Sequence, residues 1–502
     1  MKGAIFFQVL KHMMMADKDG SCCIDTSKSY SPEESLGLIL DCRLSKADYN
    51  TIRQGAKELY PSYHHVLAAK EDCIPDSGIV AADYEASVDL QSLCDHTTKR
   101  ILKTCQLKDI PPNSILEITH KVGFDGSTGQ SIYKQDSEGE RRPQAVEESL
   151  FLSCLVPLQV IIKETEEIIW TNPKPSSTQY CRPVRFQYAK ESKELVVKEF
   201  EYFKNCELTQ TVCEGLSVVH KLELTMVDGK VVNFLSPITD SCQVCAICGL
   251  SPKNMNNLEL AAEKTTNPII LDLGLNTLHA WIRCLECLLN VSYKKAISKW
   301  QARGDEAKAL VAGKKEEVRQ KLKTALGITV DVPKSGGSGT SNDGNTARTF
   351  FRNYEVSAEV LGLDTNLVKN LYVILCTVSS KHQINPDAFQ SFCMQTAKLF
   401  VLLYPWFPMP QSVHKILIHG HQVIREKPIP IGLLSEEAQE SRNKDVKNFR
   451  EHYTRKFSRK LTNVDVMRRL LCSSDPYITS LRRSIRVKNE MQLPEECLPL
   501  LA

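Results

Sequence analysis

The 502-residue sequence has almost no net charge and no hydrophobic run long enough to span a membrane. Its 63 Lys and Arg are nearly balanced by 60 Asp and Glu, so the total charge by itself does not indicate a polyanionic partner. The longest apolar stretches, 151–162 and 399–407, are far shorter than the roughly 20 residues that cross a bilayer. Residues 4–10 are too few and too polar to be the core of a secretory signal. We therefore expect neither a membrane span nor a secretory signal.

Cysteine, in contrast, is frequent. The 19 cysteines are odd in number and spread along the whole chain, which predicts reduced intracellular thiols. Charge is also unevenly distributed, because residues 441–488 hold 14 Lys and Arg against 4 Asp and Glu. A local basic excess of this kind is typical of a surface that binds nucleic acid. The length and the 42% of hydrophobic residues predict roughly two to four globular domains.

Hydrophobic periodicity separates helical from strand-rich segments. Ser31 and Ser45 each precede a helical pattern and are expected to cap it. An alternating pattern predicts strands at 114–124, 151–163, 181–189 and from 220 to a tight turn at Asp228-Gly229. Helices are expected at 278–300, at 304–327 and, capped by Ser435, at 434–460.

These segments predict an α/β protein in which helix outnumbers strand. The expected parts are a flexible arm at 1–30, a helical dimerisation or DNA-binding module at 31–113, a mixed sheet at 114–240, a mostly helical part at 241–430 with a flexible linker near 335–345, and C-terminal basic helices at 431–502.

Three acids are candidates for holding divalent cations. Asp125 follows an alternating strand, and Asp228 ends another, so adjacent strands would bring both carboxylates to one edge of the sheet. Alone, each Asp-Gly pair is more typical of a turn. Glu191, which follows another strand, is an alternative second acid. Glu440 lies in the expected helix at 434–460, where helical spacing alone predicts an ordinary salt bridge with Lys444.

A Cys/His pattern indicates a structural zinc site. Cys245 and Cys248 form a Cys-x-x-Cys pair within a cluster that also contains Cys242, and His414, His419 and His421 lie close together downstream. An all-cysteine site that instead uses Cys284 and Cys287 is the alternative, although that pair lies in an apolar helix.

The motifs FDGSTGQSIYKQ, TMVDGKVVNFLSP, the Cys-x-x-Cys, the two histidines and IGLLSEEAQESRNKDVKNFREHYTRKFSR occur in an order that resembles the Transib family of DNA transposases. This family includes the catalytic subunit of the V(D)J recombinase. The resemblance covers roughly 30–485, but a long basic N-terminal extension is not evident. It implies an RNase H-like mixed sheet with a large, mostly helical zinc-binding insertion and helical flanking domains.

The resemblance also implies roles for particular residues. Asp125, Asp228 and Glu440 become catalytic acids for Mg²⁺ or Mn²⁺, with His279 as a neighbour of the active site. Structural Zn²⁺ would be held by Cys245, Cys248, His414 and His419. Trp406 aligns with a tryptophan of the family and could stack on an unpaired base, although core packing also explains it. The residues expected to follow DNA phosphates, or otherwise to form a solvated basic face, are Arg442, Lys447, Arg450, Arg455, Lys456 and Arg459.

The function that the resemblance implies is cleavage and strand transfer at the terminal inverted repeats of double-stranded DNA. It implies a nuclear homodimer, in some members with an accessory subunit. One alternative is a domesticated DNA-binding protein that has lost catalysis. A zinc-stabilised interaction scaffold without a nucleic-acid role is the other, and it predicts no salt-sensitive retention of DNA.

Overall fold

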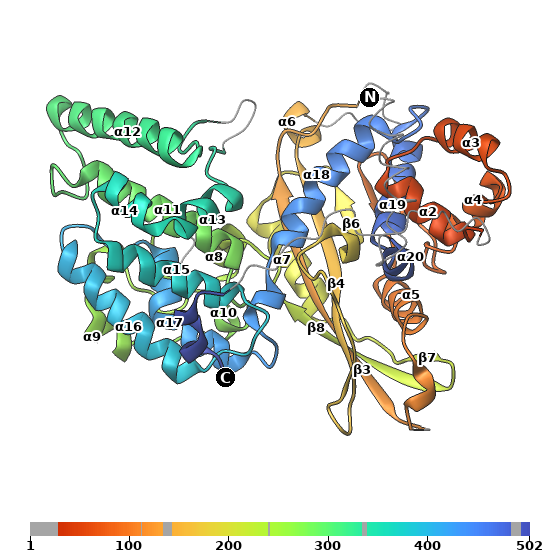
Figure 1. Ribbon diagram of the computed structural model, residues 1–502. Coiled ribbons are helices and arrows are strands. Elements are labelled where there is room, and N and C mark those ends of the chain that lie inside the picture. The colour runs from red at the N-terminus through yellow and green to blue at the C-terminus, as the bar shows by residue number, and fades with distance from the viewer. Residues whose placement is uncertain (1–28, 112, 134–142, 239–240, 334–338, 483–492) are drawn as a thin grey trace, which may run out of the picture.

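The chain forms a curled mixed β-sheet joined to a large helical half (Figure 1). The computed structural model describes residues 29–111, 113–133, 143–238, 241–333, 339–482 and 493–502. The expected arm at 1–30 lies almost entirely outside the described residues. Within them, helical residues clearly outnumber strand residues, so the expectation of a mixed α/β protein with more helix than strand is confirmed.

The sheet has eight strands in the order β1-β2-β6-β4-β3-β8-β7, with β5 paired to β4 outside this path. Strands β3, β4 and β6 are antiparallel neighbours, whereas β8 runs parallel to β3. The parallel neighbours β3 and β8 need a crossover connection. Helix α7 (Lys193–Lys204) belongs to it and lies between β6 and β8 in the chain. The strand bounds are β1 Val80–Ala81, β2 Glu85–Ser87, β3 Ile115–Ser127, β4 Leu150–Ile162, β5 Ile168–Thr171, β6 Arg182–Gln187, β7 Thr211–Cys213 and β8 Leu216–Leu224.

The two longest strands, β3 and β4, are buried along most of their length, which explains why their sequences read as nearly continuous apolar runs. Strands form within one to four residues of the positions expected from the alternating pattern. One expectation needs correction, since the part at 31–113 is not purely helical. Its strands β1 and β2 extend the sheet, and β2 pairs antiparallel with β6.

The helical half packs around an apolar core that includes Trp281, Phe350 and Phe351. Asn and Asp side chains cap many of its helices, as at Asn257, Asp364 and Asn385, because they accept hydrogen bonds from the first free backbone N–H groups. Its helices are α8 Gly229–Leu235, α9 Leu258–Glu263, α10 Pro268–Asp272, α11 Thr277–Lys294, α12 Asp305–Leu326, α13 Gly344–Arg352, α14 Tyr354–Leu361, α15 Thr365–Ser379, α16 Pro386–Leu403 and α17 Gln411–Glu426.

The N-terminal helices pack against the C-terminal ones on the far side of the sheet (Figure 1). The buried guanidinium of Arg100 pairs with Asp475 at 2.9 Å, which joins the two ends of the chain. Ser31 and Ser45 cap their helices as expected. The bounds are α2 Pro32–Asp41, α3 Lys46–Gly55, α4 Tyr63–Glu71, α5 Leu90–Leu102, α6 Gln144–Glu147, α18 Glu437–His452, α19 Arg459–Ser474 and α20 Pro476–Leu481; the 3₁₀ turns are Leu107–Asp109, Thr178–Tyr180, Pro252–Asn254, Ile431–Leu434 and Glu495–Leu500.

Two boundaries near functional segments differ from the expected ones. The helix expected at 434–460 is interrupted, because α18 ends at His452 and Ser458 caps the separate helix α19. Ser435 accepts a hydrogen bond from the backbone of Glu437, one residue before the N-cap position that Glu436 occupies. In the expected linker near 335–345, Asp343 caps α13, and residues 334–338 lie outside the described residues.

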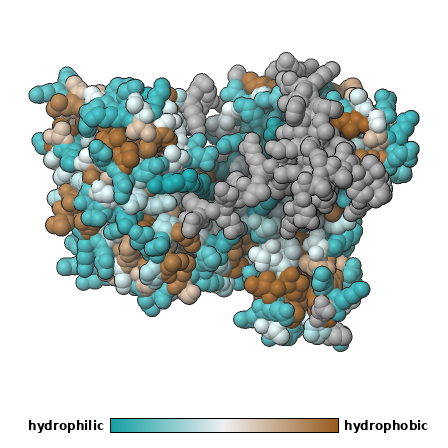
Figure 2. Space-filling view, in the orientation of Figure 1, coloured by the Kyte–Doolittle hydropathy of each residue, from teal (hydrophilic) through white to brown (hydrophobic). Residues whose placement is uncertain are grey.

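The face shown in Figure 2 is mostly hydrophilic where its residues are described, and apolar residues reach it in separate patches, one of them at the lower end of the sheet. This distribution is consistent with an apolar interior shared by both halves. In the described part of the chain, the helices are all too short or too polar to cross a membrane.

Candidate active site and metal centre

Asp125 lies near the end of β3, where two glycines allow other chain segments to approach closely. A side chain at Gly123 would overlap the backbone of Met226, which lies just beyond β8. At Gly126, a Cβ atom would lie 2.5 Å from a carboxylate oxygen of Glu191. The sequence Gly-Phe-Asp-Gly therefore places Asp125 between two segments that could not pack there against larger residues.

Asp228 follows β8, the parallel neighbour of β3, and so lies at the same edge of the sheet as Asp125. The tight turn expected at Asp228-Gly229 is absent, because Asp228 instead caps α8 and accepts a hydrogen bond from the backbone N–H of Val231 at 2.7 Å. The side chain of Asn276 donates to the carbonyl oxygen of Val227. The segment that carries Asp228 is thereby fixed to the start of α11.

Glu440 is brought to this edge by α18, which crosses β3 and β4 (Figure 1). The Nζ of Lys121, a fully buried residue of β3, donates to the carbonyl oxygens of Leu433 and Ser435 at 2.8 and 2.7 Å. Further along, Gln439 donates to the carbonyl oxygen of Leu152 at 2.7 Å. These bonds tie the start of the Glu440 helix to β3, which carries Asp125, and to the neighbouring strand β4.

His279 connects two glutamates of the α18 segment. Its Nδ1 lies 3.0 Å from a carboxylate oxygen of Glu436, and its Nε2 lies 3.3 Å from one of Glu440. Burial opposes a charged imidazole, but the hydrogen bond to Glu436 and the nearby carboxylates outweigh it and raise the pKa of His279 to about 9. A protonated His279 therefore donates to both glutamates at neutral pH and orients Glu440.

The acids at this edge destabilise one another's charges. Burial, followed by the charges of Asp228, Glu440 and Glu191, raises the pKa of Asp125 well above its usual value. Burial and Asp228 also raise the pKa of Glu191, although Lys230 pairs with Glu191 at 3.2 Å. An accumulation of carboxylates with raised pKa values is the electrostatic environment that a divalent cation relieves.

The charges of Asp228 and Glu440 both act on Asp125, so the three predicted acids lie near one another. The described residues contain two groups of three or more His, Cys, Asp or Glu side chains whose ligand atoms all lie within 4.8 Å, and the three acids do not form a third. Two cations roughly 3.5 to 4 Å apart can be held by carboxylates that do not contact one another, because different carboxylates can bind different ions. Glu191 lies beside Asp228 in the same region, so both candidates for the second acid belong to it.

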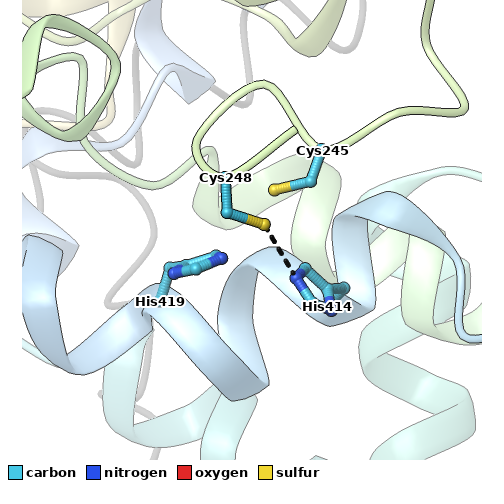
Figure 3. Close-up of side chains that lie close together, drawn as sticks. All are labelled: Cys245, Cys248, His414 and His419. Atoms are coloured by element: carbon cyan, nitrogen blue, oxygen red, sulfur yellow. Dashed lines mark hydrogen bonds between the residues drawn. The ribbon is translucent and has the colours of Figure 1, made fainter. Parts of the chain in front are cut away.

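The first of the two groups is the expected zinc tetrad, Cys245, Cys248, His414 and His419, and all four residues are buried (Figure 3). The cysteines lie on a turn after α8, and the histidines lie on α17, where a spacing of five residues keeps them adjacent. The Sγ of Cys248 lies 3.5 Å from the Nε2 of His414. Two ligands of one tetrahedral zinc ion, at ordinary Zn–S and Zn–N lengths, are separated by about 3.5 Å.

The hydrogen-bonding state of the tetrad also fits zinc. The Nδ1–H of His419 donates to Gln422 at 2.9 Å, which leaves the Nε2 lone pair available, and this Nε2 is buried without a hydrogen-bond partner. A hydrogen bond from Cys248, supported by both histidines, lowers the pKa of Cys245. The alternative pair Cys284 and Cys287 is buried in α11 and does not belong to this group, and neither do the neighbouring Cys242 and His421.

Three of the six basic residues expected to face DNA are internal, which corrects that expectation. Arg442 donates to the carbonyl oxygens of Thr178 and Cys181, so it joins α18 to the start of β6. Arg450 stacks on two tyrosine rings, and Arg459 pairs with Glu147 at 2.9 Å. Buried guanidinium groups of this kind stabilise packing and are not available to phosphates.

Lys447, Arg455 and Lys456 remain exposed. Arg455 pairs with Asp465 at 2.7 Å, and the exposed Lys447 lies on α18, in the same helix as Glu440. Trp406 is half-buried and packs edge-on against Tyr404 and Phe407, an arrangement that core packing explains.

Several site residues were not identified from the sequence. Lys121 sits at the centre of an apolar strand, where a buried lysine is unusual and could have been singled out. Asn443 donates to Asp125 at 2.8 Å, and Glu436 holds His279, but neither contact has a local signal because each joins residues more than 150 positions apart.

The fold and site thus define a mixed α/β protein with a curled mixed sheet, many helices and a Cys/His group that could bind a metal such as zinc. No protein family model matches the chain, and no curated protein matches it. A solved structure, the Drosophila P element transposase strand transfer complex, is similar over 95% of this chain and 100% of its own, with 10% sequence identity and a TM-score of 0.31. A similarity of this size carries no argument about what the chain does.

Proposed function

We propose that the chain is a DNA-cleaving and strand-transferring enzyme that holds Mg²⁺ or Mn²⁺ with Asp125, Asp228 and Glu440. The observation that carries this proposal is geometric: Asp125 and Asp228 lie at the ends of two adjacent parallel strands, and the helix of Glu440 crosses the same sheet. The raised pKa of Asp125, which burial and the neighbouring carboxylates cause, agrees with it. Carboxylates of this kind, from a strand, a helix N-cap and a distant helix, are suited to divalent cations. Ions bound there would activate a water or a hydroxyl and neutralise charge on a phosphoryl group.

The protein's own groups would keep the acids oriented. Asn443 donates to one oxygen of Asp125, and Val231 donates its backbone N–H to Asp228. The Nε2 of His279 lies 3.3 Å from a carboxylate oxygen of Glu440. We assign the sheet to the RNase H-like class because the first two acids terminate or follow adjacent parallel strands, and because the third comes from a helix that crosses the same sheet.

The zinc tetrad has a structural role in this proposal. Four protein ligands leave no open position for substrate, so a zinc ion held there would join the turn after α8 to α17 and would not act on DNA. The same α8 begins at Asp228, and the chain after α17 leads to α18. The tetrad would therefore restrain both segments that deliver acids to the site.

A nuclear homodimer acting on terminal inverted repeats, in concert with an accessory subunit, is the biological setting that we propose. Exposed basic residues of α18 and the chain beyond it, such as Lys447 and Lys456, would contact DNA phosphates close to the acids. Binding through such residues weakens steeply as the salt concentration rises.

The test uses the full chain, supercoiled plasmid DNA and a short duplex with a free 3′-hydroxyl. We expect nicking of the plasmid, and joining of the duplex to it, only when Mg²⁺ or Mn²⁺ is present. Asp125→Asn, Asp228→Asn and Glu440→Gln should each reduce nicking by on the order of 100-fold or more, because each removes a negative charge that holds the cations. Glu451→Gln, on the same helix as Glu440, is the matched control and should retain activity.

Binding and cleavage separate this proposal from its alternatives. Salt-sensitive retention of DNA without metal-dependent nicking would favour a domesticated DNA-binding protein and would refute the enzyme proposal. Absence of both would favour a zinc-stabilised scaffold. Activity that survives Asp228→Asn but not Glu191→Gln would transfer the role of second acid to Glu191.

A further inference from the structure

A second group of metal-ligand side chains lies on the sheet, apart from the zinc tetrad and the acids. Cys94 on α5, His120 on β3 and His220 on β8 present ligand atoms that all lie within 4.8 Å of one another. In the parallel ladder His220 pairs with Ile118, two residues before His120, so both histidines project from the same face. Helix α5 covers that face and supplies the thiol.

The spacing of the two imidazoles is that of ligands on one ion. The Nε2 of His120 lies 3.3 Å from the Nδ1 of His220. An N–H···N hydrogen bond is usually shorter, whereas two nitrogen ligands on a tetrahedral zinc ion are separated by about 3.3 Å at ordinary bond lengths. In the zinc tetrad, the distance between the Sγ of Cys248 and the Nε2 of His414 likewise equals that between two ligands on one zinc ion.

A hydrogen-bonded chain sets the protonation of His220. The hydroxyl of Thr211 lies 2.7 Å from the Nε2 of His220 and donates its hydrogen to the carboxylate of Asp95. The hydroxyl has one hydrogen, so it accepts from the Nε2–H of His220. The lone pair of His220 is consequently on Nδ1 and faces His120. Carboxylate-linked partners of this type commonly orient histidines that ligate metals.

His120 is fully buried, and the ligand atom that it would offer is Nε2, the nitrogen that faces Nδ1 of His220. Its other ring nitrogen, Nδ1, makes no hydrogen bond. Because Nδ1 would point away from the metal, its cost of about 1–3 kcal/mol as a buried polar atom without a partner is separate from the site.

We propose that Cys94, His120 and His220 form a second binding site for a zinc-class divalent transition-metal ion, with a water molecule as its fourth ligand. Binding forms one metal–sulfur and two metal–nitrogen bonds and releases the thiol proton of Cys94 to solvent. A cavity of about 370 Å³ beside Phe203 reaches His220 and gives solvent and metal a route to the site. One thiolate and two imidazoles favour zinc over magnesium or calcium.

The proposal does not depend on any activity toward DNA. The full chain is loaded with excess zinc in the presence of excess Mg²⁺, which competes for the carboxylates, and is then desalted and analysed for zinc per chain by mass spectrometry. We expect two equivalents in the unaltered protein. Cys94→Ser should retain one equivalent, Cys245→Ser one, and the double variant none.

Cys105→Ser is the matched control, because Cys105 follows the same helix as Cys94 and should leave two equivalents. A single equivalent in the unaltered protein refutes the proposal without any variant, so a variant that fails to fold does not weaken the test. Two equivalents in folded Cys94→Ser and in folded His220→Gln also refute it. Folding of each variant is checked by circular dichroism and by its thermal unfolding midpoint.

Discussion

Replacing Lys121 with methionine tests the link between the strand of Asp125 and the helix of Glu440. Methionine has a similar length and is apolar, so it removes the ammonium group while the core stays filled. The two hydrogen bonds that Lys121 donates, at 2.8 Å to Leu433 and 2.7 Å to Ser435, are then lost. Because these carbonyls precede α18, we expect Glu440 to lose its fixed position.

Two effects of opposite sign determine the magnitude. Each buried carbonyl left without its partner costs about 1–3 kcal/mol, or about 2–6 kcal/mol for the pair. Against this, burial lowers the pKa of Lys121 from 10.5 to about 8, so removal of the charge at neutral pH recovers about 3 kcal/mol. The net effect of Lys121→Met on stability at pH 7 is therefore small, between about 1 kcal/mol of stabilisation and about 3 kcal/mol of destabilisation. The loss of DNA nicking should be much larger than this change in stability implies.

The pH dependence of stability has a defined sign. The pKa of Lys121 is depressed in the folded state, so between pH 8 and 10.5 the unfolded chain binds more protons than the folded chain. The unaltered protein should therefore gain about 3 kcal/mol relative to Lys121→Met as the pH rises through this range. For a chain of this length that difference corresponds to about 3 °C in the thermal unfolding midpoint.

The assay compares unfolding midpoints of the two proteins at pH 7, 8, 9 and 10.5, so that titrations common to both cancel. Lys163→Met is the control, because Lys163 is exposed just after β4 and should show a difference that does not change with pH. A difference between the unaltered protein and Lys121→Met that stays constant, or that shrinks as the pH rises, would refute the reasoning.

Three further changes test other parts of the structure. Cys245→Ser should remove zinc from the tetrad and lower the unfolding midpoint, as measured by metal analysis and calorimetry. Cys242 is an exposed neighbour outside the tetrad, so Cys242→Ser should change neither quantity. Gly123→Ala should destabilise the protein by about 1–3 kcal/mol and reduce nicking, because the added methyl group overlaps the chain that leads to Asp228. A methyl group at Gly229 meets no atom within 4 Å, so Gly229→Ala should be tolerated. Lys447→Ala should lower the slope of log K for DNA binding against log salt by about 0.9, and an unchanged slope in a filter-binding titration would exclude a phosphate contact.

The parts of the fold that were predictable have local signals. Strands β3 and β4 are buried on both faces, so their apolar runs marked them, and Ser31 with Pro32 marked the start of α2. Strands β1 and β2 were missed because they are two and three residues long. Strand β1 pairs only with β2, and β2 is held by β6, about 100 residues away. Asp228 was expected in a turn because an Asp-Gly pair suits a turn and a helix N-cap alike.

Basic residues show why composition alone misplaces a binding surface. The segment that contains Arg442, Arg450 and Arg459 has the charge excess of a nucleic-acid-binding helix, but these three guanidinium groups are buried against carbonyls, tyrosine rings and Glu147. Helical spacing did not reveal this, because the partners come from segments about 260 to 320 residues earlier in the chain. A count of positive charge therefore overstated the surface available to phosphates.

The two metal-ligand groups differ in how far sequence could reveal them. Cys245 and Cys248 lie on one turn, and His414 and His419 lie five residues apart on one helix, so the two halves of the tetrad were visible in the sequence. Only their combination into one site needed further information. Cys94, His120 and His220 come singly from a helix and two strands, each in a setting where a buried cysteine or a satisfied histidine is the ordinary interpretation. Only the parallel pairing of β3 with β8, which depends on the crossover through α7, brings the two histidines together. The same pairing brings Asp125 next to Asp228, so one register in the sheet positions both the candidate catalytic acids and the proposed second metal site.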